Sequence, residues 1–250
     1  MIPTADTPPP GPGQNAQFTT THWSVVLAAG GGDSPAAQEA LAYLCQTYWY
    51  PVYAYVRRRG HSPPDAEDLT QDFFAKLIER NDFAKVSRGP RPFRAFLKGA
   101  LNHLLSDHRD HVRAAKRGGG KTILSLDAQT AEQRYLLEPT DTTTPDKLYD
   151  RRWALTLLET ARARLAEEYA VAGKGDLYNH LKSMDSGAGE ALPYAEIGRR
   201  LGKSESAIKT EASRLKRRFH NLVRAEVAQT VASPVEIDDE VRYLLTVIGG

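Results

Sequence analysis

The sequence contains a single cysteine, Cys45, among 250 residues. One thiol cannot form an intrachain disulfide, which excludes the disulfide-stapled secreted domains and fits a reducing compartment. Cys45 lies in a stretch rich in aromatic residues, so we expect it to be packed rather than reactive. No apolar run is long enough to cross a bilayer, and the first residues lack the basic start and apolar stretch of a secretory signal. We therefore expect a cytoplasmic protein without a membrane partner.

Net charge is also nearly absent, at +2 for the whole chain. The charges are nevertheless unevenly distributed, because residues 109–121 and 203–224 are basic whereas residues 126–150 carry an acidic excess. Clustered basic residues are typical of nucleic-acid contacts even where the overall charge is balanced. The charge pattern therefore points to two local segments rather than to a generally basic protein.

Convincing strands and internal repeats are absent too, and we predict an all-α fold. Apolar residues recur at helical spacing and predict helices over 36–59, 65–80 and 93–116, with a short helix near 23–27. Pro51 falls inside the first long helix, where it removes a backbone donor, so we expect a kink or break at that residue.

Composition divides the chain into five segments. Residues 1–20 are rich in Pro, Gly and Thr and are expected to be disordered. A first helical domain covers 21–117, and the polar, acidic segment 118–146 is expected to be a flexible linker. A second helical domain covers 147–227. The tail, 228–250, includes a short helix at 235–247 that either caps apolar surface or docks on a partner.

The most informative local pattern is LPYAEIGRRLGKSESAIKTEASRLKRR at 192–218. Tyr194, Ile197 and Leu201 recur at helical spacing. Gly202 tolerates the positive φ of a tight turn, and Ser204 is a suitable N-cap for a second, basic helix. This order is typical of a helix-turn-helix, whose second helix enters the DNA major groove. An ordinary helical hairpin with a charged, solvated face is the alternative interpretation.

Several motifs, taken together, resemble a known family. The motifs RRRG at 57–60, DAEDLTQDFF at 65–74 and FRAFL at 93–97 follow one another as in region 2 of bacterial sigma factors of the extracytoplasmic-function (ECF) type. The segment 192–218 is similar to their region 4, and the resemblance covers about residues 20–227. It implies a non-enzymatic sigma-70 family factor without metal or cofactor. Its partners would be core RNA polymerase, through the largest-subunit clamp helices and the flap region, and promoter DNA.

The resemblance assigns three groups of residues in this sequence. An acidic group would pair with the basic clamp helices: Asp65, Glu67, Asp68, Gln71 and Asp72. A second group would bind and open the −10 element, where aromatic walls hold unstacked bases and cations hold phosphates: Phe83, Arg88, Arg91, Phe93, Arg94, Phe96, Lys98, Asn102, Arg109 and Arg113. A third group would read the −35 element: Lys203, Ser204, Ser206, Lys209, Thr210, Ser213, Arg214, Arg217 and Arg218.

Two positions depart from the family's pattern. Phe96 stands where tryptophan is frequent, and a place in the hydrophobic core is its alternative role. Glu211 stands where a basic residue is common, and its carboxylate would repel phosphates but could accept a hydrogen bond from a cytosine N4.

Regulation of such factors implies further partners, either an anti-sigma factor or a Ser/Thr protein kinase. Thr70 lies beside the acidic group, where a phosphate would add negative charge facing the clamp. We therefore name Thr70 as a hypothetical phosphorylation site.

Two other functions compete with this interpretation. A stand-alone helix-turn-helix regulator would leave the acidic helix at 65–74 without a role. A metal-dependent nuclease would use Asp65, Glu67 and Asp68 together with the histidines of a cluster at 103–111. That cluster, His103, Asp107, His108 and His111, places His108 away from the others on a helix, so no metal site is expected. GGGKT at 118–122 follows a predicted helix rather than a strand, which argues against a phosphate loop.

Overall fold

A computed structural model describes residues 35–80, 92–112, 128–138, 144–185, 192–231 and 233–249. Every regular element in these ranges is a helix, which confirms the all-α prediction for this part of the chain. The elements are α2 (Pro35–Thr47), α3 (Trp49–Arg58), α4 (Pro63–Arg80), α6 (Phe93–Val112), α7 (Ala128–Leu136), α8 (Pro145–Val171), α9 (Gly175–Asp185), α10 (Tyr194–Leu201), α11 (Glu205–Ala228), the 3₁₀ turn η1 (Pro234–Glu236) and α12 (Ile237–Gly249). None of the helices in these ranges is long and apolar enough to span a membrane. The helix expected near 23–27 lies outside the described residues.

The first long helix is interrupted, but not at its proline. The break falls at Tyr48, whose φ of −106° and ψ of 19° separate α2 from α3. Pro51 lies in the first turn of α3, where the backbone N–H that proline lacks has no helical partner anyway. The expected position of the break was therefore wrong by three residues, because proline is compatible with the start of a helix.

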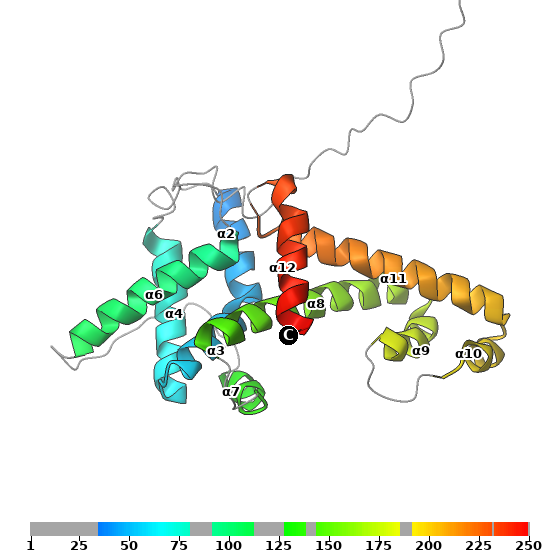
Figure 1. The fold of residues 1–250 in the computed structure, drawn as a ribbon, viewed down its shortest axis with the longest axis horizontal. Coiled ribbons are helices and arrows are strands. Elements are labelled where there is room, and N and C mark those ends of the chain that lie inside the picture. Colours follow the sequence, from blue (N-terminus) through cyan, green and yellow to red (C-terminus); the bar gives the residue numbers. More distant parts are fainter. Residues whose placement is uncertain are drawn as a thin grey trace, which may run out of the picture.

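A first hydrophobic cluster forms around α3, in which residues 49–56 are all buried. The ring of Tyr48 stacks on Trp153 of α8 with ring centroids 3.7 Å apart, and Phe93 of α6 lies 5.9 Å from the same indole. Cys45 is completely buried here, as expected, and burial raises the pKa of its thiol. The aromatic residues of α2, α3, α6 and α8 thus form one core, and Figure 1 shows these helices grouped at one end of the molecule.

A second hydrophobic cluster lies at the other end of α8 and joins it to α9, α10 and α11 (Figure 1). Ala161 and Leu165 of α8 belong to this cluster, whereas Leu148, Trp153 and Leu157 of the same helix belong to the first. The packing therefore does not follow the expected domain border at 146/147, since one helix of 27 residues takes part in both clusters.

The segment expected to be a linker contains the helix α7, which packs on α3. Glu132 of α7 accepts hydrogen bonds from Tyr53 Oη at 2.6 Å and from Arg57 Nε at 2.8 Å. Glu138 accepts one from Tyr50 Oη at 2.7 Å. Polar residues suggested a linker here. In the structure, two of them, Glu132 and Glu138, accept hydrogen bonds from the tyrosine hydroxyl groups of the buried helix α3.

The tail forms a helix, as expected, and α12 crosses α8 and α11 near the middle of the molecule (red in Figure 1). Val241 and Leu244 are buried in the first hydrophobic cluster. The tail helix therefore covers apolar surface, which was one of the two roles considered for it.

Candidate functional site

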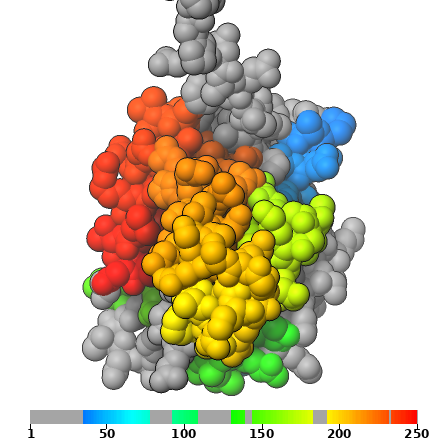
Figure 2. Space-filling view, turned by 90° about the vertical axis from the view of Figure 1, so that its right-hand side faces the viewer, coloured from blue at the N-terminus to red at the C-terminus, as the bar shows by residue number. Residues whose placement is uncertain are grey.

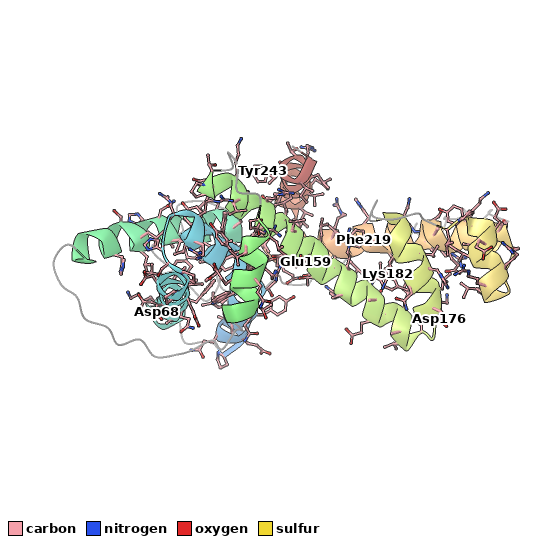
Figure 3. All side chains as sticks on the ribbon, turned by 90° about the horizontal axis from the view of Figure 1, so that it is seen from below. Asp68, Glu159, Asp176, Lys182, Phe219 and Tyr243 are labelled. Atoms are coloured by element: carbon pink, nitrogen blue, oxygen red, sulfur yellow. The ribbon has the colours of Figure 1, made fainter. Side chains whose placement is uncertain are left out.

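The acidic start of α4 is formed by a local hydrogen-bond pattern. Ser62 precedes Pro63, and its Oγ accepts a hydrogen bond from the Asp65 backbone N–H at 3.3 Å. The same hydroxyl donates to Asp65 Oδ2 at 2.6 Å. Ser62 thus caps the start of α4 by accepting from a backbone N–H, with a proline at the first helical position. Asp65 and Asp68 are exposed, and Figure 3 places Asp68 at the opposite end of the molecule from α9 and α10.

The remaining polar residues of this group are partly engaged within α4. Gln71 Nε2 donates to Glu67 Oε1 at 3.1 Å, and Asp72 Oδ2 lies 2.6 Å from Lys76 Nζ. Asp65 and Asp68 are thus the two carboxylates of α4 that face solvent without a cationic partner among the described residues.

Thr70 is not a phosphorylation site in this fold. Its side chain is completely buried, and its hydroxyl donates to the backbone oxygen of Ala66 at 2.6 Å. A kinase needs an accessible hydroxyl, and a phosphate at this position would have to be buried against apolar side chains. Thr70 lies four residues after the buried Ala66 and therefore shares its face of α4, and that face packs into the core. The hypothesis fails for this reason.

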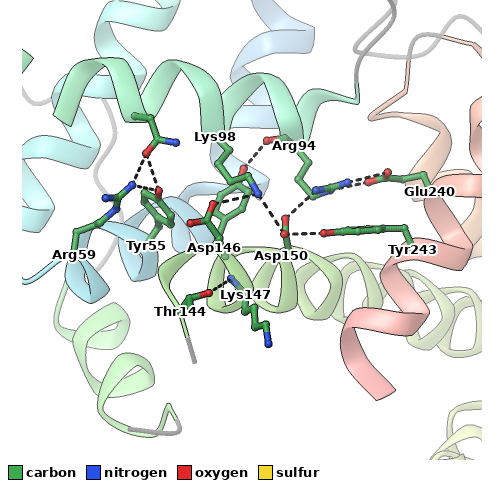
Figure 4. A network of polar contacts seen from close by, with 12 residues as sticks. Tyr55, Arg59, Arg94, Lys98, Thr144, Asp146, Lys147, Asp150, Glu240 and Tyr243 are labelled. Atoms are coloured by element: carbon green, nitrogen blue, oxygen red, sulfur yellow. Dashed lines mark hydrogen bonds and ion pairs between the residues drawn. The ribbon is translucent and has the colours of Figure 1, made fainter. Parts of the chain in front are cut away.

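The helix α6 carries the described part of the predicted −10 group, and much of it faces inward. Phe93 and Phe96 are both buried, with ring centroids 6.1 Å apart, so Phe96 takes the core position that was its alternative role. Asn102 Oδ1 accepts hydrogen bonds from Tyr55 Oη and from Arg59 Nη2, both at 2.7 Å (Figure 4). A role for these three residues in DNA binding stays a prediction.

The two described cations of this group are paired with carboxylates from elsewhere in the chain (Figure 4). Arg94 Nη1 lies 2.9 Å from Asp150 Oδ1, and Arg94 Nε lies 2.9 Å from Glu240 Oε1. Lys98 Nζ lies 3.4 Å from carboxylate oxygens of both Asp146 and Asp150. Four further residues of the group, Phe83, Arg88, Arg91 and Arg113, lie outside the described residues, as does the side chain of Arg109.

The two helices at 194–228 are joined as the sequence predicts. Gly202 ends α10 with φ 62° and ψ 33°, in the left-handed region that glycine adopts without strain. The Lys203 N–H donates to the Gly198 carbonyl at 2.9 Å, and Ser204 Oγ accepts from the Ala207 N–H at 3.2 Å as the N-cap of α11. The tight turn and the capped second helix are therefore confirmed.

The face of α10 and the first half of α11 is exposed (yellow to orange in Figure 2, between α9 and α12). On α11, three cations have carboxylate partners: Lys209 with Glu205 at 2.7 Å, Arg214 with Glu211 at 3.0 Å, and Arg218 with Glu168 at 2.5 Å. Lys203 and Arg217 are exposed and have no ion pair among the described residues, and Ser206, Thr210 and Ser213 are exposed as well. All nine predicted −35 residues thus lie on one helix and the turn before it.

Glu211 does not face outward with these residues. Its side chain is only 16% exposed, and it lies 3.0 Å from Arg214 and 3.8 Å from Lys174 in the turn between α8 and α9. The carboxylate therefore fixes α11 against that turn, and a contact from Glu211 to a cytosine is not favoured by this geometry.

Gly198 is a structurally required position in the turn that sequence reasoning missed. A Cβ on Gly198 would lie 2.6 Å from the Lys203 carbonyl oxygen, closer than real contacts allow. We expect Gly198→Ala to lower the free energy of unfolding by about 1–3 kcal/mol, because the backbone of the turn must move. Urea unfolding followed by circular dichroism measures the change.

Gly99 provides the matched control, since it is helical and a Cβ there meets nothing within 4 Å. Gly99→Ala should leave stability unchanged or raise it by up to about 1 kcal/mol, as expected for helix propensity alone. Equal effects of the two substitutions would contradict the close approach at Gly198.

Comparison with known proteins gives one match. Residues 44–117 match the family model of sigma-70 region 2, a range that includes α3, α4 and α6. No curated protein and no solved structure matches the chain. The match shows that this range of the chain is similar to sigma-70 region 2.

Proposed function

We propose that this chain is a sigma factor of the ECF type that joins core RNA polymerase, recognises −35 and −10 promoter elements and helps to melt the DNA. The observation that carries this proposal is a sigma-70 region 2 match over 44–117 followed, at 194–228, by a capped basic helix behind a tight turn. A region 2-like part at 21–117 and a region 4-like part at 147–227 are the corresponding functional units.

The polymerase-binding surface in this proposal is the start of α4. Asp65 and Asp68 are exposed, and Asp68 lies away from Phe219 of the basic helix α11, so the two surfaces can be used at the same time (Figure 3). A carboxylate pair gains from a cationic partner at an interface, and the clamp helices would supply it.

The −35 surface is the exposed side of α11. Two of its ion pairs are between exposed side chains, Lys209 with Glu205 and Arg218 with Glu168, the latter with side-chain exposures of 47% and 39%. Exposed pairs contribute little to stability, so their cations can exchange a carboxylate for a DNA phosphate at small cost. Arg217 and Lys203 would contact phosphates directly.

Run-off transcription with purified core polymerase and genomic promoter fragments tests the proposal. We expect binding to core and defined transcripts that depend on this chain. Sequence-specific DNA binding by the free chain, without binding to core or a transcript from any fragment, would instead identify a stand-alone helix-turn-helix regulator.

Charge reversal on α4 tests the polymerase contact. We expect Asp65→Lys combined with Asp68→Lys to weaken core binding by about 100-fold, because two attractions become repulsions. Fluorescence anisotropy of the labelled chain titrated with core measures the affinity, and circular dichroism checks that the helices remain folded.

The matched control makes the same charge change on α8 and α9. Glu167 and Asp176 are both exposed, and Asp176 lies at the opposite end of the molecule from Asp68 (Figure 3). Glu167 belongs to the last turns of α8, which leads into α9. Glu167→Lys with Asp176→Lys should reduce core affinity far less. Similar losses for the two pairs would show that net charge, rather than α4, determines the binding.

A further inference from the structure

The N-terminal turn of α6 is enclosed by two segments that come later in the chain. Arg94 is bound along one edge by Glu240 of α12, with Nε–Oε1 at 2.9 Å and Nη2–Oε2 at 3.2 Å, and at Nη1 by Asp150 of α8. The Tyr243 ring lies 4.2 Å from the guanidinium carbon, and Tyr243 Oη donates to Asp150 Oδ2 at 2.8 Å. Figure 4 shows the guanidinium held between the two helices.

The backbone of this turn is engaged as well. The Phe93 N–H donates to the Thr230 carbonyl at 2.7 Å, and Tyr149 Oη donates to the Arg94 carbonyl at 3.1 Å. The first backbone N–H of α6, which has no partner within its own helix, is therefore bound by the segment that leads into α12. The Arg94 side chain and the backbone at Phe93 and Arg94 are therefore bound by α8, by α12 and by the segment between α11 and α12.

The charges in this contact have the pattern of an anion site that is already filled. Three carboxylates, from Asp146, Asp150 and Glu240, face two cations. The guanidinium fork binds a carboxylate and a phosphate in the same two-pronged way. Burial disfavours the charge on Arg94, but the hydrogen bonds and charge of Glu240, with Asp150, outweigh it and raise the pKa of Arg94.

We infer that the α6 surface bearing Arg94 and Lys98 is a shared site, in which Glu240 occupies the place of a DNA phosphate while Asp150 stays bound to Arg94. The segment 233–249 is then an internal competitor that keeps this surface closed in the free chain and leaves it when DNA binds. The inference rests on the proposed function, since it takes the −10 strand as the competing ligand.

The part that moves is α12 rather than α8. The apolar attachment of α12 consists of the buried Val241 and Leu244 with the partly buried Ile237 and Ile248, whereas Tyr149 and Trp153 of α8 are completely buried among aromatic rings. Elements with few buried apolar contacts open at lower free-energy cost. When Glu240 leaves, Arg94 still has Asp150 as a partner, so release does not leave an unpaired buried cation.

Glu240→Gln tests the competition, with Asp239→Asn as the matched control. Each substitution removes one negative charge from α12, but Asp239 is exposed and pairs with Arg242 rather than with α6. The first readout is amide hydrogen exchange over 237–249 in the full chain. The second is the affinity for a short, fluorescein-labelled single-stranded DNA of random sequence.

We expect Glu240→Gln to speed exchange in α12 and to raise DNA affinity by about tenfold, as for a site that is open in about one chain in ten. Asp239→Asn should change neither by more than about twofold. A similar rise for both variants would show that general electrostatics is responsible and would overturn the inference.

The wild-type chain provides a test without any variant. Exchange over 237–249 should become faster when the DNA probe saturates the protein, and unchanged protection of α12 would overturn the inference. A failure of the proposed function is seen separately, as absence of run-off transcripts from wild type. If transcripts form equally with wild type and Glu240→Gln, and α12 stays protected with DNA bound, the proposed function stands and the competition is wrong.

Discussion

Arg94→Ala will lower the free energy of unfolding by about 3 kcal/mol, because it leaves a buried carboxylate without its cation. Glu240 is 5% exposed and has Arg94 as its ion-pair partner. Asp150 keeps Lys98 Nζ at 3.4 Å and Tyr243 Oη at 2.8 Å, which holds the loss at the lower end of the range for broken buried pairs. Urea unfolding monitored by circular dichroism measures it.

Two further substitutions make this expectation specific. Arg242→Ala removes a cation from α12 that pairs with the exposed Asp239, and it should cost no more than about 0.5 kcal/mol. Arg94→Lys keeps the charge but loses the fork that binds Glu240 at two atoms, so an intermediate loss is expected. If Arg94→Ala were no more harmful than Arg242→Ala, the buried network would contribute nothing to stability.

Trp153→Ala will lower the free energy of unfolding by about 3–5 kcal/mol, the range for removing a buried aromatic side chain and leaving a cavity. The indole is completely buried, stacks on Tyr48 at 3.7 Å and lies 5.9 Å from both Phe93 and Tyr149. It therefore joins the α2–α3 break, α6 and α8 in one contact. The midpoint of urea unfolding should fall accordingly.

Trp153→Phe serves as the graded control for this effect. Trp153 Nε1 has no hydrogen-bond partner among the described residues, so phenylalanine removes volume without breaking a hydrogen bond. We expect a loss clearly smaller than for alanine, since most of the stacking surface remains. Losses of equal size would mean that the cavity is not the cause.

Local sequence signals were sufficient for several elements of this fold. The turn at 202–204 was predictable because a glycine that must adopt positive φ and a serine that must accept from a backbone N–H each act within four residues. The helices at 65–80 and 93–112 follow from apolar spacing in the same way. Pro51 misled the prediction because the rule for proline depends on where the helix begins, and α3 begins only two residues before Pro51.

Which charged residues are paired with one another in the fold could not be predicted from the sequence. Arg94 and Glu240 are 146 positions apart, and no local pattern connects them. A basic side chain in a motif indicates charge, but not whether a carboxylate from another helix already holds it, as Glu168 does with Arg218. Composition likewise suggested a linker at 118–146, whereas Glu132 has specific partners on α3.

The continuity of α8 makes the two ends of the molecule thermodynamically dependent on each other. A helix of 27 residues is a rod of about 40 Å, and its two halves belong to different hydrophobic clusters. Neither half of the rod can lose its helical form without removing buried side chains from the adjoining cluster. A ligand that stabilises one cluster therefore also shifts the folding equilibrium of the other, so that binding events at the two ends are thermodynamically coupled.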